Sequence, residues 1–189
     1  MKAHNPIETS LKDSVATMLS LIPIVPFIDK FAQSVVETFD SGNKIIVIGN
    51  GGSAADAQHF ATEMVVRYKK TGIALPAIAL TTDTSILTAT GNDINFDQIF
   101  ARQVEALGRR GDMLLAISTS GNSRNILRAA EVAKNLSLFT VALTGKTGGR
   151  LSQLCHMVIK VPQNATSRVQ EAHIAILHAV CEVVESQKR

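Results

Sequence analysis

Residues 44–60 read KIIVIGNGGSAADAQHF, which is a short apolar run, a glycine-rich turn and the start of a helix-forming stretch. Runs rich in Val, Ile, Leu and Ala recur along the chain, at residues 76–81, 112–118, 138–144 and 156–161. Because these runs are nearly continuous rather than alternating, they are typical of strands that are buried on both faces of a parallel sheet covered by helices. Together with residues 44–49, they predict five strands.

Helix-forming stretches separate the predicted strands, at residues 54–68, 96–107, 124–135 and 149–154, and a final helix is predicted over residues 167–186. This alternation predicts a doubly wound α/β domain with a parallel five-stranded sheet flanked by helices. In such a domain, ligands bind beyond the carboxyl ends of the strands. The polar turns that follow the strands are therefore the places to look for a site.

The residues before the first strand form a different kind of segment. Residues 7–20 and 27–40 have helical patterns, and the prolines of LIPIVPF (21–27) interrupt the pattern between them. We expect an N-terminal helical pair within about residues 1–41, followed by an α/β core over about residues 42–189. The length of 189 residues agrees with a single domain, 1–189.

Composition argues against several classes of protein. A net charge of +3, no Trp and one Tyr are poor features for nucleic-acid binding, which uses a clustered basic face and stacking aromatic side chains. We expect no apolar run near the roughly 18 residues needed to cross a bilayer, and residues 1–14 lack the apolar core of a signal peptide. A cytoplasmic protein without membrane or nucleic-acid partners is expected. Cys155 and Cys181 have no C-x-x-C spacing and are expected to be free thiols.

The turn after the first predicted strand, Gly49-Asn50-Gly51-Gly52-Ser53, leads straight into a helix. Glycines let backbone N–H groups approach a ligand closely, and the helix N-terminus adds a partial positive charge, so an anion suits this turn. The turn lacks G-K-[ST], and no ribose-binding acid follows a G-x-G-x-x-G pattern, so no nucleotide cofactor is indicated. The competing interpretation is an ordinary turn with a capping serine.

A second polar turn, STSGNS at residues 118–123, follows the third predicted strand and again precedes a helix. Hydroxyl groups at a helix N-terminus can hold phosphate oxygens without a cationic side chain. An ordinary capped turn is again the alternative. Two such turns at one edge of the sheet favour a phosphorylated small molecule as the ligand.

Four polar side chains on the predicted helices form a candidate constellation. His59 and Glu63 lie four residues apart and share one helical face, where both can meet one metal or substrate or form a solvated pair. Gln170 and His178 are eight residues apart on the final helix, about 80° around its axis and about 12 Å along it. The two side chains either reach toward each other, or one serves a neighbouring subunit. A core histidine and a surface amide are the alternative.

Several segments, taken in order, resemble the phosphoheptose isomerases of the sugar-isomerase (SIS) superfamily. They are GNGGSAADAQHFATE (49–63), ALTTDTS (79–85), GND (91–93), GDMLLAISTSGNS (111–123) and RVQEAHIAILH (168–178). The resemblance covers about residues 30–186. It implies a single SIS domain, a homotetramer with active sites between subunits, and conversion of sedoheptulose 7-phosphate into D-glycero-D-manno-heptose 7-phosphate through an enediol. That reaction is the first step toward ADP-heptose and the lipopolysaccharide core.

The resemblance also implies roles for individual residues. The substrate would be held at the sugar by Asn50, Gly51, Gly52, Asn92 and Asp93 and at the phosphate by Ser118, Thr119, Ser120 and Ser123. Ser53, Glu63 and Gln170 would also bind the substrate. One Zn²⁺ per subunit would be bound by His59, Glu63, Gln170 and His178. Glu63 would be the catalytic base and His178 the acid. A metal-bound carboxylate or imidazole is a poorer proton carrier than a free one, so the metal would polarise the carbonyl or be structural. Two nitrogen and two oxygen ligands do not fix the metal as zinc.

Two other interpretations belong to different classes. One is a non-catalytic SIS relative that associates with the bacterial replication initiator, and it keeps the phosphate loops but lacks counterparts of Glu63 and His178. The other is a sugar-phosphate sensor that regulates transcription, and such sensors usually carry an added DNA-binding domain, for which this length is expected to leave no room. The presence of Glu63 and His178 favours the enzyme.

Overall fold

A computed structural model of the chain describes residues 5–188. Five parallel strands form one sheet in the order β2-β1-β3-β4-β5. The predicted doubly wound parallel sheet is therefore confirmed. The strands are β1 (Ile45–Gly49), β2 (Ala77–Ala79), β3 (Met113–Ser118), β4 (Phe139–Thr144) and β5 (Met157–Lys160).

Alternate side chains of the central strands supply two hydrophobic cores, one on each face of the sheet. In β1, Ile45 and Val47 join one core, while Ile46 and Ile48 join the other. The prediction of burial on both faces holds for β1, β3 and almost all of β4. It is wrong for β2 and most of β5, because these edge strands have a neighbour on one side only.

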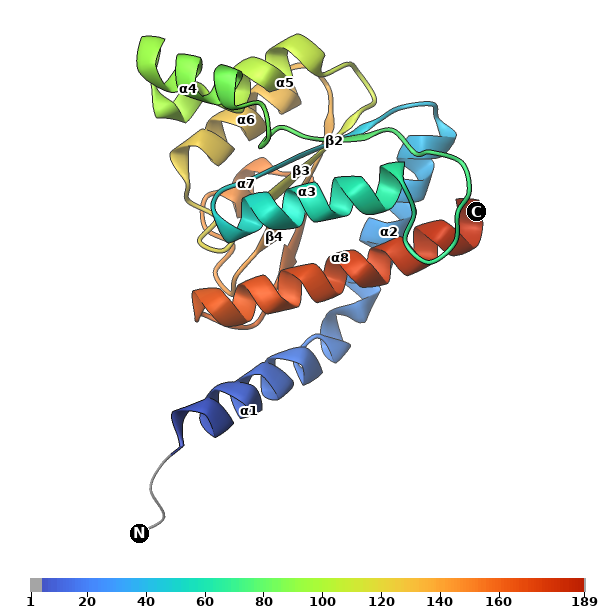
Figure 1. Ribbon diagram of the computed structural model, residues 1–189, viewed down its shortest axis with the longest axis vertical. Helices are drawn as coiled ribbons and strands as arrows, with labels where there is room; N and C mark the ends of the chain where they lie inside the picture. Colours follow the sequence, from blue (N-terminus) through green and yellow to red (C-terminus); the bar gives the residue numbers. More distant parts are fainter. Residues whose placement is uncertain (1–4, 189) are drawn as a thin grey trace.

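Helices cover both faces of the sheet (Figure 1). Side chains of α2, α3 and α8 fill the core on one face, and side chains of α5, α6 and α7 fill the core on the other. The helical elements are α1 (Pro6–Leu19), η1 (Ile22–Ile24), α2 (Val25–Asp40), α3 (Gly52–Val65), α4 (Thr84–Asp93), η2 (Phe96–Gln98), α5 (Ala101–Leu107), α6 (Arg124–Asn135), α7 (Leu151–Leu154) and α8 (Thr166–Lys188).

Two helical predictions differ from the structure. The single helix predicted over residues 96–107 is broken into η2 and α5. Helix α4 was not predicted, because its Thr, Gly and Asn residues have weak helix propensity. The local signal that marks its start is Asp83, whose carboxylate caps the helix by accepting a hydrogen bond from the Ile86 N–H at 2.9 Å.

The N-terminal helical pair is confirmed, and α1 projects away from the sheet domain (Figure 1). Residues Pro6–Asp40 are long and apolar enough to cross a membrane by length and composition alone, although the segment is divided into α1, η1 and α2. The expectation that no apolar run approaches this length is therefore wrong. The α2 part of this segment packs into the core through Phe31 and Val35, whereas much of the apolar surface of α1 is exposed.

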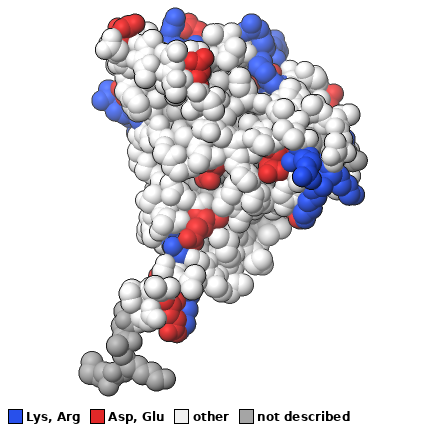
Figure 2. Space-filling model, viewed as in Figure 1, with Lys and Arg blue, Asp and Glu red and all other residues white. Residues whose placement is uncertain are grey.

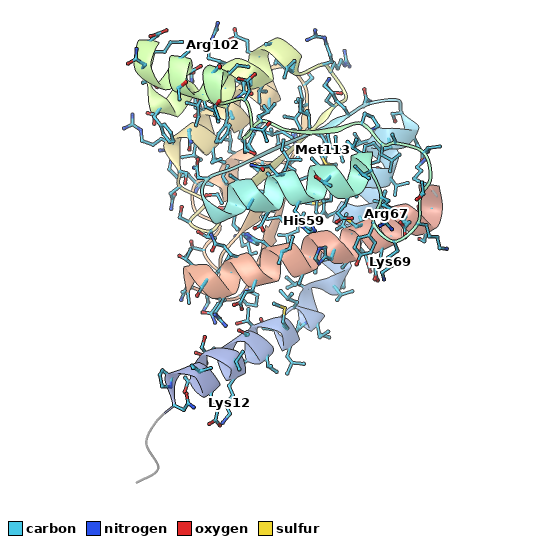
Figure 3. The ribbon with its side chains drawn as sticks, viewed as in Figure 1. Lys12, His59, Arg67, Lys69, Arg102 and Met113 are labelled. Atoms are coloured by element: carbon cyan, nitrogen blue, oxygen red, sulfur yellow. The ribbon has the colours of Figure 1, made fainter. Side chains whose placement is uncertain are left out.

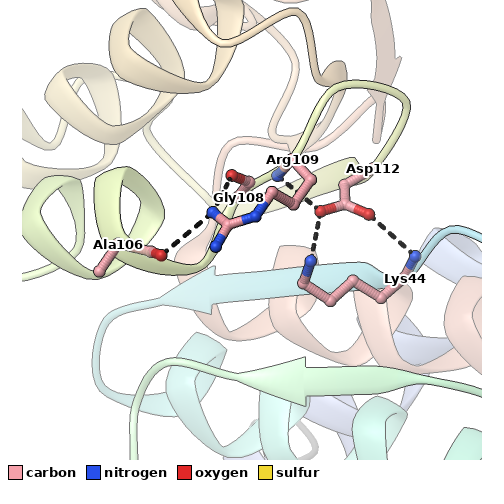
Figure 4. Close-up of polar contacts among 5 residues, drawn as sticks. All are labelled: Lys44, Ala106, Gly108, Arg109 and Asp112. Atoms are coloured by element: carbon pink, nitrogen blue, oxygen red, sulfur yellow. Dashed lines mark hydrogen bonds and ion pairs between the residues drawn. The ribbon is translucent and has the colours of Figure 1, made fainter.

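A buried carboxylate fastens the amino ends of β1 and β3 together (Figure 4). Asp112 is 2% exposed and accepts hydrogen bonds from the backbone N–H groups of Lys44 at 3.1 Å and Arg109 at 2.8 Å. It also pairs with the Lys44 ammonium group. The contact fixes the relative position of the two strands whose opposite, carboxyl ends carry the polar loops.

Candidate functional site

The two polar loops lie together at the point where the strand order of the sheet reverses. The chain leaves β1 toward β2 and leaves β3 toward β4, so a crevice opens between the carboxyl ends of β1 and β3. The prediction that both loops share one edge of the sheet is confirmed. A cavity of about 260 Å³ lies there, lined by Asn50, Gly51, Gly52, Ser53, Ile117, Ser118, Thr119, Ser123, Thr166 and Gln170.

The glycines of the first loop are required by its backbone. A Cβ on Gly49 would lie 2.3 Å from the carbonyl oxygen of Ser53, and Gly51 has φ +56°. Helix α3 begins at the next residue, and no side chain caps it. Its positive end therefore faces the cavity without a competing carboxylate or hydroxyl from the flanking loop, as an anion site requires.

The second loop presents hydroxyl groups to the same cavity. Ser118, Thr119 and Ser123 line it, and Ser123 precedes α6 without capping that helix. Ser120 differs, because it is exposed and its hydroxyl accepts a hydrogen bond from the Asn122 N–H at 3.1 Å. Three of the four predicted phosphate residues thus face the cavity, and Ser120 bonds within its own loop.

Helices α3 and α8 lie side by side and run in the same direction (Figure 1). This alignment sets Gln170 of α8 beside Gly52 at the start of α3. A Cβ on Gly52 would lie 2.6 Å from the side-chain nitrogen Nε2 of Gln170. Gln170 therefore reaches the cavity because the residue opposite it has no side chain.

Farther along the same two helices, His59, Glu63 and His178 meet. The Nε2 atoms of His59 and His178 are 2.9 Å apart, and His59 Nε2 is 3.2 Å from Glu63 Oε1. The two rings pack edge to face with centroids 4.9 Å apart, and His59 lies between α3 and α8 (Figure 3). The structure thus brings three of the four predicted metal ligands together.

The donor atoms of this cluster suit zinc chemically, because imidazole nitrogen and carboxylate oxygen are common zinc ligands. Gln170 lies with the loops instead, about 12 Å before His178 along α8. Within residues 5–188, no three His, Cys, Asp or Glu side chains are placed as a metal site. The residue types therefore suit a metal, but within residues 5–188 the side chains of one chain are not arranged as a metal site.

Asp56 belongs to the same face of α3, between Gly52 and His59, and sequence reasoning missed it. Its Oδ2 atom is buried and has no hydrogen-bond partner in the part of the chain that the structure describes. Burial raises the pKa of Asp56, and the neighbouring His59 offsets only part of this rise, which leaves the pKa at about 6. A carboxyl group with this pKa exchanges a proton near neutral pH. Its spacing of four residues from Gly52 and three from His59 is the signal that could have found it.

A charged cluster borders this helix pair at the end of α3. Glu185 of α8 accepts hydrogen bonds from the backbone N–H groups of Lys69 and Lys70, at 2.8 and 2.7 Å. Tyr68 lies with its ring 5.8 Å from that of His178. Figure 2 shows Lys and Arg gathered on this side of the molecule, where Figure 3 labels Arg67 and Lys69, and a largely uncharged surface beside it.

Asn92 and Asp93 are not brought to the cavity. They are exposed at the end of α4, where the Asn92 amide donates to the Asp93 carboxylate at 2.8 Å. Helix α4 lies away from α8 (Figure 1). Cys155 and Cys181 form no disulfide, as predicted, and burial raises the pKa of Cys155 to about 11.

Comparisons with known proteins agree with this geometry. Residues 25–145 match the SIS domain family. The chain is 52% identical over 160 residues to phosphoheptose isomerase of Aliarcobacter butzleri, covering 85% of each chain. It is 45% identical over 181 residues to that of Helicobacter hepaticus, covering 96% of this chain and 92% of the relative.

Solved structures of phosphoheptose isomerases also resemble this chain over nearly its whole length. A phosphoheptose isomerase from Francisella tularensis superposes with a TM-score of 0.94 at 37% identity, over 98% of this chain and 100% of the other. That from Neisseria gonorrhoeae superposes with a TM-score of 0.90 at 41% identity, over 95% and 97%. Nothing in these comparisons supports the replication-initiator alternative.

Proposed function

The chain belongs to the phosphoheptose isomerases of the SIS domain family and is a sugar-phosphate isomerase, and we propose sedoheptulose 7-phosphate as its substrate. The product is D-glycero-D-manno-heptose 7-phosphate, which enters the pathway to ADP-heptose and the lipopolysaccharide core. The observation that carries the proposal is the cavity at the β1/β3 crevice, with the hydroxyl-rich loop of residues 118–123 at one side and the His59, Glu63 and His178 cluster on the adjoining helix pair.

The second loop is the place for the phosphate group. The side chains of Ser118, Thr119 and Ser123 line the cavity, and the N-terminus of α6, which Ser123 does not cap, contributes its partial positive charge. Neutral donors are sufficient, because hydrogen bonds to an ionised phosphate are about twice as strong as those between neutral groups. The sugar then extends toward Gly51, Gly52 and Gln170.

Isomerisation moves a hydrogen between the first two carbons of the sugar. A base removes a proton from C1 of the ketose while an acid protonates the C2 carbonyl oxygen, which gives the enediol with its C1–C2 double bond. A proton is then returned to C2 as the C1 hydroxyl group loses its proton, and C1 becomes the aldehyde. We assign the base to Glu63 and the acid to His178. His59 contacts both, so it fixes their relative position.

A metal ion is part of the proposal. His59, Glu63 and His178 supply donors for zinc, and Gln170 is the fourth ligand proposed. When bound, zinc would polarise the substrate carbonyl as a Lewis acid. The chain's own residues hold the sugar, orient the carboxyl and imidazole groups and carry the protons.

We further propose a homotetramer with the active sites between subunits. Three observations support self-association. Gln170 lies apart from the histidine cluster, Asn92 and Asp93 lie away from the cavity of their own chain, and α1 exposes a row of apolar side chains. A neighbouring subunit can supply what each site lacks.

The function is tested by incubating the purified chain with sedoheptulose 7-phosphate and identifying the product. We expect Glu63→Gln to lower kcat by about 10²- to 10⁴-fold, because it removes the base but keeps the size of the side chain. Glu37→Gln, at an exposed position on α2, is the matched control. Full activity of Glu63→Gln would show that another group is the base.

The metal and the alternative function have separate tests. Chelation should lower turnover, and added zinc should restore it, whereas indifference to both would leave the metal without a role in the reaction. If the wild-type chain converts no sugar phosphate but binds the replication initiator, the non-catalytic interpretation replaces the enzyme.

A further inference from the structure

A pair of asparagine side chains joins the two loops of the site across the crevice. The Asn50 amide donates to Asn125 Oδ1 at 2.9 Å, and the Asn125 amide donates back to Asn50 Oδ1 at 2.8 Å. Asn50 belongs to the loop after β1, and Asn125 lies in the first turn of α6, just after the serine loop. The two residues are 75 positions apart in the chain.

The surroundings of Asn125 hold this pair in one orientation. Its side chain is 3% exposed, and its Oδ1 atom also accepts a hydrogen bond from the Ile126 N–H at 3.0 Å. Because the oxygen already has two donors, rotating the carboxamide by half a turn would face amide against amide and lose these bonds. Asn125 therefore fixes which edge of its amide meets Asn50.

The loop that receives this contact needs an external constraint. Gly51 has φ +56°, and Gly49 packs against the Ser53 backbone with no room for a Cβ. Such backbone geometry persists when the surrounding structure specifies it. Asn50 lies between these two glycines and lines the cavity, so a contact on its side chain acts directly on the conformation of the sugar-binding loop.

We infer that Asn125 is a positioning residue, which fixes the Asn50 carboxamide. It thereby holds the sugar-binding loop, residues 49–53, at a set distance from the phosphate-binding loop, residues 118–123. The inference rests on the proposed function, because it assigns the two loops to the two ends of one substrate. Asn125 does not itself line the cavity. Its effect on the substrate passes through Asn50.

The test is a double-mutant cycle on kcat and KM. Asn125→Ala should lower kcat/KM for sedoheptulose 7-phosphate by about 10- to 100-fold, as expected for a displaced contact. In the Asn50→Ala background, the same change should have an effect of less than about threefold, because the partner through which Asn125 acts is gone. Asn135→Ala, at the exposed end of α6, is the matched control.

Affinity for inorganic phosphate, measured by calorimetry, separates this role from general damage to the fold. We expect it to stay within about twofold of the wild-type value in Asn125→Ala, because the hydroxyl groups and the α6 N-terminus remain. Additive effects of Asn50→Ala and Asn125→Ala on kcat/KM would overturn the inference. So would a loss of phosphate affinity that matches the loss of kcat/KM.

Hydrogen exchange keeps the inference testable if the proposed reaction fails. The backbone amides of residues 50–54 should exchange faster in Asn125→Ala than in the wild type or in Asn135→Ala. If the wild-type chain does not convert sedoheptulose 7-phosphate, the proposed function fails, while faster exchange still supports the positioning role. Unchanged exchange overturns that role whatever the activity.

Discussion

At the scale of single residues, the site depends on one missing side chain. Gly52 begins α3 and leaves room for Gln170, whose amide nitrogen would be 2.6 Å from a Cβ at that position. The two neighbouring glycines are required for other reasons. Gly51 has a φ of +56°, which other residues rarely adopt, and a Cβ on Gly49 would clash with the Ser53 backbone. Replacing Gly52 by alanine would therefore displace the Gln170 side chain without a clash against the backbone.

We expect Gly52→Ala to lower kcat/KM by about 10-fold or more without loss of stability. The added methyl displaces the flexible end of Gln170 from the cavity, a misplacement that is costly for catalysis. Gly52 does not have a positive φ, and alanine has a better intrinsic helix propensity than glycine, so the fold should accept the change. Kinetics with sedoheptulose 7-phosphate and a thermal melt measure the two effects.

The control for Gly52→Ala is Ala55→Ser, an exposed change in the same turn of α3. It should leave both activity and melting temperature close to wild type. A fully active Gly52→Ala variant would show that the position of Gln170 is unimportant, and a large fall in melting temperature would show that Gly52 has a structural role instead.

At the scale of elements, α8 carries one face that contributes to the candidate site and another that packs in the core. Gln170 and His178 face α3, whereas His173 is 0% exposed and packs in the core. Both ring nitrogens of His173 are buried without a well-formed hydrogen bond. Burial lowers the pKa of His173 to about 4, and the Thr144 backbone offsets this only in part. The ring is therefore neutral at pH 7.

This buried histidine predicts acid-sensitive stability. Between pH 6.5 and about 4, the unfolded chain binds a proton at His173 that the folded chain does not, so stability is present above pH 6.5 and falls as the pH is lowered through this window. The difference between a pKa of 6.5 in the unfolded chain and about 4 in the folded chain lowers the free energy of unfolding by about 3 kcal/mol once the pH is below both values. His173→Leu should remove this loss, as measured by denaturant unfolding at several pH values. An unchanged pH profile in His173→Leu would contradict the assignment.

At the scale of the whole molecule, α1 stands outside the sheet domain (Figure 1). Ile7, Leu11, Val15 and Leu19 recur at intervals of four and are 70, 62, 61 and 66% exposed. Residues at this spacing lie along one side of a helix. An exposed apolar row of this kind marks a protein or membrane contact, and burial of each such side chain stabilises the contact by about 1.5–3 kcal/mol.

We expect the double variant Leu11→Lys with Val15→Lys to weaken assembly of the proposed tetramer. Two charges in the apolar row cannot be buried without partners. Light scattering during gel filtration should show a lower mass, and activity should fall with it if the sites lie between subunits. Asp13→Lys, exposed on α1, is the control.

Two results would contradict the prediction that the apolar row of α1 is a subunit contact. An unchanged mass would show that the α1 row is not a subunit contact. Binding of the wild-type chain to lipid vesicles, lost in the double variant, would instead assign the Pro6–Asp40 segment to a membrane surface.

The sequence alone determined the layered α/β architecture and the two loops. Apolar runs and the turns after them are local features, so the strands and the helices α3, α6 and α8 could be predicted from neighbouring residues. Helix α4 and the break between η2 and α5 could not, because their residues have weak propensities and tertiary packing decides such cases. Resemblance to a family supplied the expected residue roles that spacing left open.

The tertiary structure alone decided which of these features meet. The strand order β2-β1-β3 places the two loops at one crevice, and the parallel course of α3 and α8 pairs Gly52 with Gln170 and His59 with His178. Asn50 and Asn125 are joined across 75 positions. A sequence pattern records the neighbours of a residue along the chain, whereas these contacts depend on how separate elements pack across a shared core, which no local pattern specifies.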